Sequence, residues 1–338
     1  MSITINDVAR ESGVSIATVS RVLSGKNSVS EKTFTLVMET SKKLGYKPKK
    51  TKETKNSKKK VMLIVGDIMN PFYLEIIQGI TDVLNPIGIK IAIFYSYNDP
   101  KIEENYVSFA QEDNYNGIIM ITATETVALI ELLKKNVCPV VLVNRFIRSM
   151  DLDAVCIDNV RGGYMATEYM VKNGHKKIAH LAGPNNSTTS IDRLRGYMNA
   201  LNDCGLEINK SAIYTGDLKR GSGEKFGEYY IEKLRDYSAV FCANNLMAAG
   251  FIDEISKYGL KVPDDVSVIC FDDTPISTES PVKMTTVSKE PDVMGQVAAE
   301  IMTSVFKDPK RTLKRKIVFP PVLNERCSVK NLIKEPIK

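Results

Sequence analysis

The sequence predicts an α/β protein in which a small all-α head is followed by two doubly wound parallel-sheet lobes. Short helical stretches bounded by glycines fill the first 46 residues, and from residue 61 apolar strand-like runs alternate with helical stretches. Charge is also divided unevenly: residues 1–60 hold 14 Lys/Arg against 5 Asp/Glu, a balance of +9, whereas the 338-residue chain carries +6. A basic head on a slightly acidic body indicates a polyanion as the partner of the head.

The first two helices of the head are marked by capping residues and glycines. Thr4 is a favourable N-cap, Asp7 lies where its carboxylate reaches back to that cap, and Gly13 can take the left-handed conformation that ends the helix. Ser15 caps the second helix after a turn of about three residues, and Gly25 ends it. Two short helices joined by a tight glycine-containing turn describe a helix-turn-helix unit.

A third helix is expected from a Ser30 cap to Gly45, where it completes a small core. Its apolar residues recur at helical spacing and predict one buried stripe, formed by Phe34, Val37, Met38 and Leu44. The head predicted from these signals covers residues 1–46.

The second helix, IATVSRVLS, has a packing face and a free face. At 100° per residue the packing face gathers Val19, Val22 and Leu23, and the free face gathers Ile16, Ala17, Ser20 and Arg21. The free face can enter a major groove, where Arg21 can pair with guanine and small apolar side chains can touch thymine methyls. Ser20 and Thr18 are short donors suited to phosphates. The alternative is a small helical domain whose exposed Arg21 is only solvated.

The body consists of two series of strand-like runs with helices between them. Continuous apolar runs separated by helices indicate parallel sheets covered on both faces, and two series indicate two lobes. The first series is VMLIVGD, IKIAIFY, NGIIMIT and PVVLVN. The second is AVCI, KIAHLA, SAVFCA and VSVICF.

The carboxyl ends of these strands are unusually polar, and in such sheets ligands bind beyond those ends. The polar residues there are Asn70, Asn98, Asp99, Thr122, Asn144 and Arg145 in the first series, and Asn244, Asn245, Asp272 and Asp273 in the second. Together with Phe72 and Tyr73 as stacking surfaces, they suit a polyhydroxylated small molecule such as a sugar. Taken singly, each residue could instead be a loop cap or a turn former.

The head resembles a known family of regulators. TINDVARESGVSIATVSRVLSG, followed by VSEKT and LGYKP, is similar to the N-terminus of lactose and galactose repressor (LacI/GalR) family proteins. The resemblance implies a sequence-specific DNA-binding transcription regulator. It assigns groove reading to Ile16, Ala17 and Arg21. It assigns contacts with the DNA backbone to Ser15, Thr18 and Ser20.

The body resembles the effector-binding core of the same family, which is similar to periplasmic sugar-binding proteins. The matching segments include IMNPFY, DRLRGY and GLKVPDDVSVICFDD. The resemblance implies a core over 61–338 whose chain crosses between the lobes near Asn159, Ser288 and Pro320. It implies an N-lobe of about 61–159 plus 289–319 and a C-lobe of about 160–288 plus 320–332.

The same resemblance implies the residues that contact the effector: Phe72, Tyr73, Arg145, Arg193, Asn244, Asp272 and Lys289. Three positions differ from the family's usual pattern, since Asn144 and Asn245 stand where Asp is frequent and Lys289 where a neutral Gln is frequent. All three differences remove negative charge or add positive charge, which favours an anionic effector. We therefore hypothesise an acidic sugar or a sugar phosphate as effector. The alternative is that Lys289 points to solvent or pairs near Glu290.

A nucleotide-dependent α/β enzyme is one alternative function. Its G-x-G-x-x-G fingerprint is missing, because GSGEKFG at 221–227 has the wrong spacing, and no GxxxxGK[ST] loop occurs. The two histidines, His175 and His180, lack a suitable nucleophile, and the six cysteines have neither metal-ligand nor redox spacing. We therefore expect no enzyme activity, no catalytic residue, no metal and no cofactor, and buried free thiols in a reducing compartment.

A free solute-binding protein is the other alternative. It would explain the body but not the basic head, and it would need an export signal, which MSITINDVAR lacks. No apolar run approaches the ~18 residues that a membrane span needs. The sequence thus predicts a cytoplasmic repressor of carbohydrate-utilisation genes with no membrane partner.

Residues 47–60, KPKKTKETKNSKKK, are expected to form a basic linker between head and core. Eight of these fourteen residues are lysines, which can neutralise phosphates without reading sequence. The resembling family usually carries a hinge helix here, whose Leu wedges into the minor groove. Since no such wedge residue lies between Pro48 and Val61, we expect no central kink in the bound DNA.

One helix-turn-helix reads only a few base pairs, so a homodimer on a pseudo-palindromic operator is expected. Effector binding between the lobes should change their closure and thereby operator affinity, by about 5–150-fold for a coupling of 1–3 kcal/mol. The sequence leaves open whether the effector releases the DNA or promotes its binding.

Overall fold

The computed structural model describes residues 4–23, 30–46, 59–136 and 138–333, and it divides into two compact units, Met1–Ser57 and Lys58–Lys338. The predicted linker 47–60 lies outside the described residues except for Lys59 and Lys60. Each unit is therefore considered by itself.

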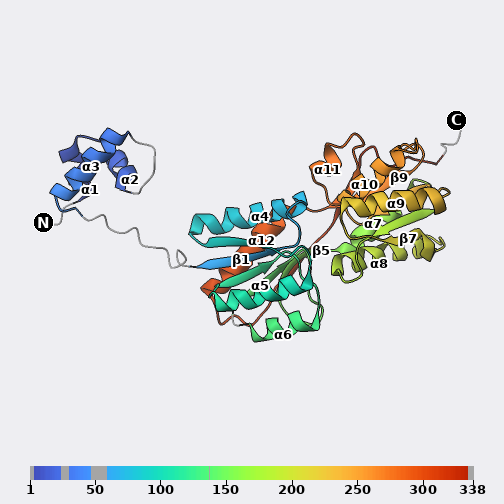
Figure 1. Cartoon of the computed structure of the whole chain (residues 1–338), viewed down its shortest axis with the longest axis horizontal. Helices are drawn as coiled ribbons and strands as arrows, with labels where there is room; N and C mark the ends of the chain where they lie inside the picture. Colours follow the sequence, from blue (N-terminus) through green and yellow to red (C-terminus); the bar gives the residue numbers. More distant parts are fainter. Residues whose placement is uncertain (1–3, 24–29, 47–58, 137, 334–338) are drawn as a thin grey trace. The chain divides into compact units, whose positions relative to one another are not determined.

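The first unit is the helical head (Figure 1). Its helices are α1 (Ile5–Ser12), α2 (Ile16–Leu23) and α3 (Glu31–Lys43). As the capping pattern predicts, the backbone N–H of Thr4 donates to Asp7 Oδ2 at 2.9 Å, and Gly13 is left-handed with φ 68°. At the start of α3, the backbone N–H of Thr33 donates to Ser30 Oγ at 3.3 Å. The three predicted helices thus begin where their caps placed them, and the predicted end of the second helix at Gly25 lies outside the described residues.

The core of the head is small and consists of Val8, Ala9, Val19, Val22 and Val37. The prediction for the third helix is only partly right, because Phe34 and Met38 are 43% and 44% exposed instead of buried. The reason is length: α3 has 13 residues, whereas α1 and α2 have 8 each and cover only part of its apolar surface.

The N-lobe of the second unit is a parallel sheet with the strand order β11-β5-β4-β3-β1-β2. Its strands are β1 (Lys60–Val65), β2 (Lys90–Tyr95), β3 (Gly117–Met120), β4 (Val140–Val143), β5 (Asp153–Ile157) and β11 (Lys316–Phe319). Its helices are α4 (Pro71–Leu84), η1 (Asn85–Ile87), α5 (Pro100–Glu112), α6 (Val127–Lys135) and α12 (Pro291–Lys307).

Both faces of the N-lobe sheet are covered, with α4 and α12 on one face and α5 and α6 on the other (Figure 1). Along β1, Leu63 packs with the residues of α4 and α12, and Met62 and Ile64 pack with those of α5 and α6. Because successive strand residues point to opposite faces, this arrangement explains why the run VMLIVGD is continuously apolar.

The C-lobe repeats this plan with the strand order β12-β10-β9-β8-β6-β7, in which only the β12 pairing is antiparallel. Its strands are β6 (Ile178–Ala182), β7 (Ile213–Thr215), β8 (Ala239–Cys242), β9 (Ser267–Phe271), β10 (Thr285–Ser288) and β12 (Val322–Asn324). Its helices are α7 (Asn159–Lys172), α8 (Thr188–Asp203), η2 (Lys210–Ala212), α9 (Arg220–Lys233), α10 (Asn245–Ser256) and α11 (Pro275–Thr278). Helices α7 and α8 cover one face, and α9 and α10 cover the other.

The assignment of AVCI to the second series of strands is wrong. These residues form β5, which pairs with β4 and β11 inside the N-lobe sheet. The next element, α7, already belongs to the C-lobe, so chain order does not reveal which sheet this strand joins. The chain crosses between the sheets after β5, after β10 and after β11.

The predicted fold class, a small all-α head followed by two doubly wound lobes, is confirmed by this architecture. Within the described parts of the chain, no helix combines the length and the apolar character needed to cross a membrane. The cysteines are free thiols, but burial was predicted correctly only for some, because Cys204 and Cys327 are exposed.

Candidate functional site

The polar strand ends meet in one cleft between the two lobes of the core. Its cavity holds about 30 Å³, room for roughly one or two water molecules, so the lobes stand close together around it. The lining residues are Asp67, Asn70, Phe72, Tyr73, Asn98, Asn144 and Arg145 from the N-lobe, and Thr189, Arg193, Asp217, Leu218, Lys219, Asn244 and Asp272 from the C-lobe. Six of the seven residues expected at the effector site line this cavity, and Lys289 does not.

Two asparagine caps place helix N-termini at the cleft. Asn70 Oδ1 accepts from the backbone N–H of Phe72 at 3.0 Å, at the start of α4. Asn244 Oδ1 accepts from the backbone N–H of Met247 at 2.9 Å, at the start of α10, and its Nδ2 donates to Leu218 O at 2.8 Å. The partial positive charge of both helix ends therefore lies beside the cavity.

Two strands end in left-handed residues that line the cavity. Asn144 follows β4 with φ 67°, and Asp272 follows β9 with φ 71°. Their backbone N–H groups still extend the sheets, donating to Val155 O at 2.8 Å and to Val287 O at 3.1 Å. Asn and Asp tolerate this conformation better than other residues with a Cβ, which explains why they stand at both turns.

Arg193 is buried and fully engaged within the C-lobe. Its Nε donates to Asn159 Oδ1 at 2.8 Å, and its Nη1 donates to Ala243 O. The guanidinium lies 3.8 Å from Asp272 Oδ1 and stacks 3.8 Å above the Phe271 ring. Burial lowers the pKa of Arg193 and raises that of Asp272, while their mutual attraction opposes both shifts. These contacts hold Arg193 in place before any effector binds.

Arg145 is equally buried but has almost no partner. Its Nη2 reaches Asn98 Oδ1 only at 3.5 Å. Among the described residues, neither Arg145 Nε nor the neighbouring Asn144 Oδ1 has a hydrogen-bond partner. Because a buried donor or acceptor without a partner costs about 1–3 kcal/mol, this side of the cleft is suited to a ligand that supplies both partners.

Lys289 lies elsewhere because it follows β10 at a crossing between the lobes. Its Nζ pairs with Glu290 Oε2 at 2.5 Å, and it lines a second cavity with Glu75 and Asn324. The alternative weighed for this residue, a pair near Glu290, is thus what the structure has. Asn245 is also absent from the effector cavity, since its Nδ2 donates to Thr274 Oγ1 at 2.7 Å. Of the three residues that differ in charge from the family's usual pattern, Asn144, Asn245 and Lys289, only Asn144 lines the cleft.

Other residues at the strand ends have structural roles. Asp99 Oδ1 accepts from the backbone N–H of Lys101 at 2.8 Å and caps α5, and Thr122 is buried beside Ser96. The sequence missed five lining residues, namely Asp67, Thr189, Asp217, Leu218 and Lys219. Asp67 closes the quoted run VMLIVGD and could have been found by the same strand-end rule. The segment 217–219 follows β7, which was not predicted.

An ion pair joins the lobes beside the cavity. Arg148 Nη2 lies 2.6 Å from Asp192 Oδ1, and Asp192 directly precedes Arg193 in α8. The carboxylate is 9% exposed and the guanidinium 40%, so the pair is partly screened by water. It links α8 of the C-lobe to the segment that follows β4 in the N-lobe.

The exposed side of α2 is where a DNA-reading surface is expected. Ile16 is 51% exposed, whereas Val19 and Val22 are buried, as predicted. Ser15 Oγ accepts from the backbone N–H of Thr18 at 3.1 Å and so caps α2. The side chains of Ala17, Ser20, Arg21 and Leu23 lie outside the described residues, and the DNA-contact roles in this helix stay predictions.

Comparison with known proteins identifies the family. Residues 58–324 match the family described as "Periplasmic binding proteins and sugar binding domain of LacI family", and residues 4–49 match "Bacterial regulatory proteins, lacI family". The chain belongs to the LacI family. This LacI-family protein is a DNA-binding transcription regulator with a helix-turn-helix head and a core of the sugar-binding type, as the resemblance of its motifs implied.

Several relatives of this LacI-family regulator match it along almost the whole chain. The HTH-type transcriptional regulator DegA of Bacillus subtilis (strain 168) is 32% identical over 98% of this chain and 99% of its own. The HTH-type transcriptional repressor PurR of Photobacterium profundum is 30% identical over 97% and 99%. The structure of the transcriptional regulator CelR in complex with cellobiose has a TM-score of 0.74 and 27% identity, covering 96% and 99%.

The relatives of this LacI-family chain are regulators, which excludes the enzyme alternative. The histidines agree with that conclusion: His180 lies in β6 between the rings of Tyr197 and Phe241, at 5.0 and 4.6 Å, and its Nδ1 donates to Phe241 O at 2.8 Å. Burial lowers the pKa of His180 from 6.5 to about 4. His175 bonds to Ser238 Oγ and Lys330 O. Both side chains have structural partners.

Proposed function

We propose that a sugar binds in the cleft between the lobes, which must move apart to admit it because the present cavity holds only about 30 Å³, and that this binding changes the affinity of the regulator for operator DNA. The observation that carries the proposal is the pair of buried atoms without partners, Arg145 Nε and Asn144 Oδ1, beside the rings of Phe72 and Tyr73. A hydroxyl both donates and accepts, so neighbouring sugar hydroxyls can satisfy the two atoms together. The complex of the relative CelR with cellobiose supports this ligand class.

A neutral sugar fits the charges of the cleft best. The lining side chains comprise the carboxylates of Asp67, Asp217 and Asp272 and the cations Arg145, Arg193 and Lys219. These charges balance, and Lys289, on which the anion hypothesis partly rested, pairs with Glu290 instead. A second candidate, an acidic sugar or sugar phosphate, is favoured by Arg145, because a carboxylate would satisfy its free Nε.

Calorimetric titration with matched sugars tests the effector class. The panel is D-glucose with D-glucuronate and glucose 6-phosphate, D-galactose with D-galacturonate, and D-ribose and cellobiose. We expect the neutral member of each set to bind more tightly. Tighter binding of the acidic members, lost in Arg145→Met, would establish the second candidate. If no sugar of the panel bound or altered operator affinity, the proposal would fail.

We also propose that α2 reads the operator through Ile16, Ala17 and Arg21 and contacts its phosphates through Ser15, Thr18 and Ser20. Arg21→Ala should weaken operator binding by about 1–3 kcal/mol and relax the preference at one base pair. Thr18→Ala should weaken all sequences evenly and serves as the control. Mobility-shift titrations against operators substituted at single positions distinguish the two. Uniform weakening by Arg21→Ala would remove its reading role.

The regulator is proposed to act as a homodimeric repressor on a pseudo-palindromic operator in the bacterial cytoplasm. One head reads too few base pairs for a specific site, so two heads related by a two-fold axis are needed. The name of the relative PurR as a repressor supports the direction of control. Sedimentation of the protein with full and half operators provides the test, and full affinity for a half operator by a monomer would contradict the dimer.

The lysine-rich linker is proposed to hold DNA without bending it. Its sequence lacks an apolar wedge, and each phosphate contact should add about 0.9 to the slope of log affinity against log salt. Circular-permutation mobility shift measures the bend directly. A strong bend at the operator centre would contradict the proposal.

A further inference from the structure

Arg326 makes a bidentate ion pair with Asp273, the residue that follows Asp272 of the cleft. Its Nη1 lies 2.7 Å from Asp273 Oδ1, and its Nη2 lies 2.8 Å from Asp273 Oδ2. Asn324 Nδ2 adds a third bond to Asp273 Oδ2 at 3.0 Å. Both carboxylate oxygens are thus occupied, and this fork geometry fixes position as well as charge.

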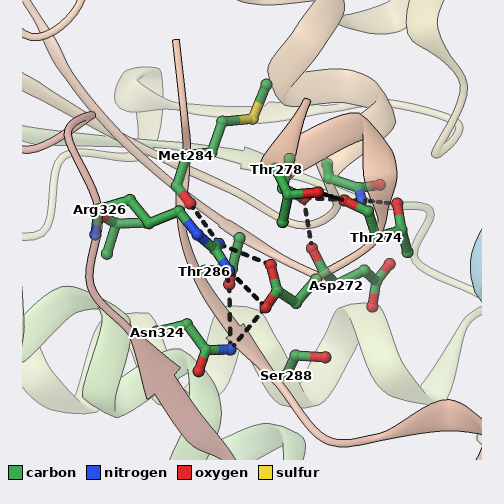
Figure 2. Close-up of polar contacts among 12 residues, drawn as sticks. Asp272, Thr274, Thr278, Met284, Thr286, Ser288, Asn324 and Arg326 are labelled. Carbon is green, nitrogen blue, oxygen red and sulfur yellow. Dashed lines mark hydrogen bonds and ion pairs between the residues drawn. The ribbon is translucent and has the colours of Figure 1, made fainter. Parts of the chain in front are cut away.

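The same two side chains tie three strands together. Arg326 Nη1 also donates to Met284 O at 2.8 Å, and Figure 2 shows Arg326 and Asn324 converging on Thr286 of β10. Asn324 ends β12, which pairs with β10 in an antiparallel ladder. Since β10 leads into one crossing between the lobes and β12 follows another, the pair with Asp273 connects the end of β9 to both crossings.

Asp273 is the neighbour of the effector-site residue Asp272. Asp272 is left-handed with φ 71°, and its carbonyl oxygen accepts from Ser277 Oγ at 3.0 Å. Its own carboxylate lies in the cavity, 3.8 Å from Arg193. A left-handed non-glycine residue costs energy and persists only where its surroundings fix it. Because both carboxylate oxygens of Asp273 are bound by Arg326, the backbone directly after Asp272 is held in place.

We propose that Arg326 is a positioning residue for effector recognition. By holding Asp273, it keeps Asp272 directed at Arg193 in the cleft, and it joins this effector contact to the strands that cross between the lobes. The inference rests on the proposed sugar site and extends it, because it assigns a residue outside the cavity to the setting of effector affinity. Arg326 itself does not line the cavity.

The chain contains a matched control. Arg311 donates through Nη2 to both oxygens of Asp153, at 2.6 Å each, and thereby ties the segment before β11 to β5 in the N-lobe. Asp153 is the first residue of β5, at the end of the strand away from the cleft. Asp153 lies in β5 and Asp273 lies two residues after β9, but only Asp273 adjoins an effector-site residue.

Hydrogen exchange in the ligand-free protein tests the positioning without reference to any sugar. In Arg326→Met, the backbone amide of Asp272, which donates to Val287 O, should exchange at least about 5-fold faster than in the unmodified protein. In Arg311→Met its rate should stay unchanged. An unchanged rate in Arg326→Met, or equal acceleration in both variants, would overturn the positioning role.

Effector affinity provides the second test, by calorimetry with the neutral sugar of the panel that binds most tightly. We expect about 10-fold weaker binding by Arg326→Met, an intermediate value for Arg326→Lys, which keeps the charge without the fork, and unchanged binding by Arg311→Met. In an Asp272→Asn background, Arg326→Met should add little, because both changes act on one contact. Additive losses would indicate a merely structural role. Failure of every sugar to bind would contradict the proposed function, while the exchange result would still decide the role of Arg326.

Discussion

The two walls of the effector cleft end their strands alike but hold their polar side chains differently. The N-lobe wall, formed by Asn144 and Arg145, has an acceptor and a donor without partners among the described residues. The C-lobe wall, formed by Arg193 and Asp272, is tied to Asn159, to Ala243 and, through the next residue, to Arg326. The N-lobe wall thus has hydrogen-bonding groups that a ligand can satisfy, whereas the polar groups of the C-lobe wall are already paired within the protein.

This difference teaches how a single cleft can both recognise and respond. A wall whose hydrogen bonds are already made loses little freedom when a ligand binds, so it fixes the ligand's orientation. A wall with unsatisfied buried groups forms new hydrogen bonds with the ligand, and it forms them only when the lobes close around that ligand. Removing residues from each wall should therefore give different combinations of lost stability and lost affinity.

The largest effect is expected from the C-lobe wall. Arg193→Met leaves Asp272 buried without its cation, which should lower the free energy of unfolding by about 3–5 kcal/mol and abolish measurable sugar binding. Urea denaturation and calorimetry measure the two losses. Adding Asp272→Asn should restore part of the stability but not the binding. Normal stability in the single variant would show that the C-lobe wall is not preset.

The burial of His180 in the C-lobe should make the free energy of unfolding depend on pH. Because burial lowers the pKa of His180 from 6.5 to about 4, the unfolded chain binds a proton that the folded chain rejects. This group leaves the free energy of unfolding unchanged above pH 6.5 and lowers it, by about 3 kcal/mol in all, as the pH falls toward 4. His180→Phe should flatten this slope between pH 4.5 and 7 in urea denaturation. Equal slopes in both proteins would contradict it.

The N-lobe wall should behave in the opposite way. Arg145→Met should weaken sugar binding by about 10–100-fold, because it removes a charged donor, while the free energy of unfolding changes by less than about 1 kcal/mol. Among the residues that the structure describes, the buried Nε has no hydrogen-bond partner whose loss would destabilise the fold. Calorimetry and urea denaturation on the same preparation give both values. A loss of stability like that of Arg193→Met would erase the contrast between the walls.

The smallest effect is expected from the ion pair that joins the two lobes. Arg148→Met removes the N-lobe partner of Asp192 and leaves Arg195 of the same helix at 3.5 Å, so it should weaken sugar binding by only about 2–5-fold at low salt, with little effect at 0.5 M salt, where such pairs are screened. Lys177→Met, which removes an exposed pair with Asp236 within the C-lobe, is the control. Equal effects of both substitutions would show that the Arg148 pair has no part in closure.

The expectation that ligands bind beyond the carboxyl ends of parallel strands predicted much of the site. It could not tell which of the polar residues at those ends line the cavity. Asn144, Arg145, Asn244 and Asp272 line the cavity as proximity to strand ends suggests. Asp273 satisfies the same rule, yet its carboxylate points to Arg326, because successive residues after a strand take different directions. Leu218 and its neighbours were missed because the strand before them, β7, spans only Ile213–Thr215 and gives a weak pattern.

The sequence by itself determined the head, the alternation of strands and helices, and the family. Caps, glycines and apolar periodicity are local signals, and they need no knowledge of distant contacts. Only the tertiary structure decided that Phe34 stays exposed and which of the two interpretations of Lys289 holds, namely the one in which it pairs with Glu290. It also decided which cleft arginine is already paired. The exposure of Phe34 and the contacts of the cleft arginines depend on residues far apart in the chain, which local signals do not reveal. Lys289 pairs with its neighbour Glu290 because it leaves β10 at a crossing between the lobes, away from the effector cavity.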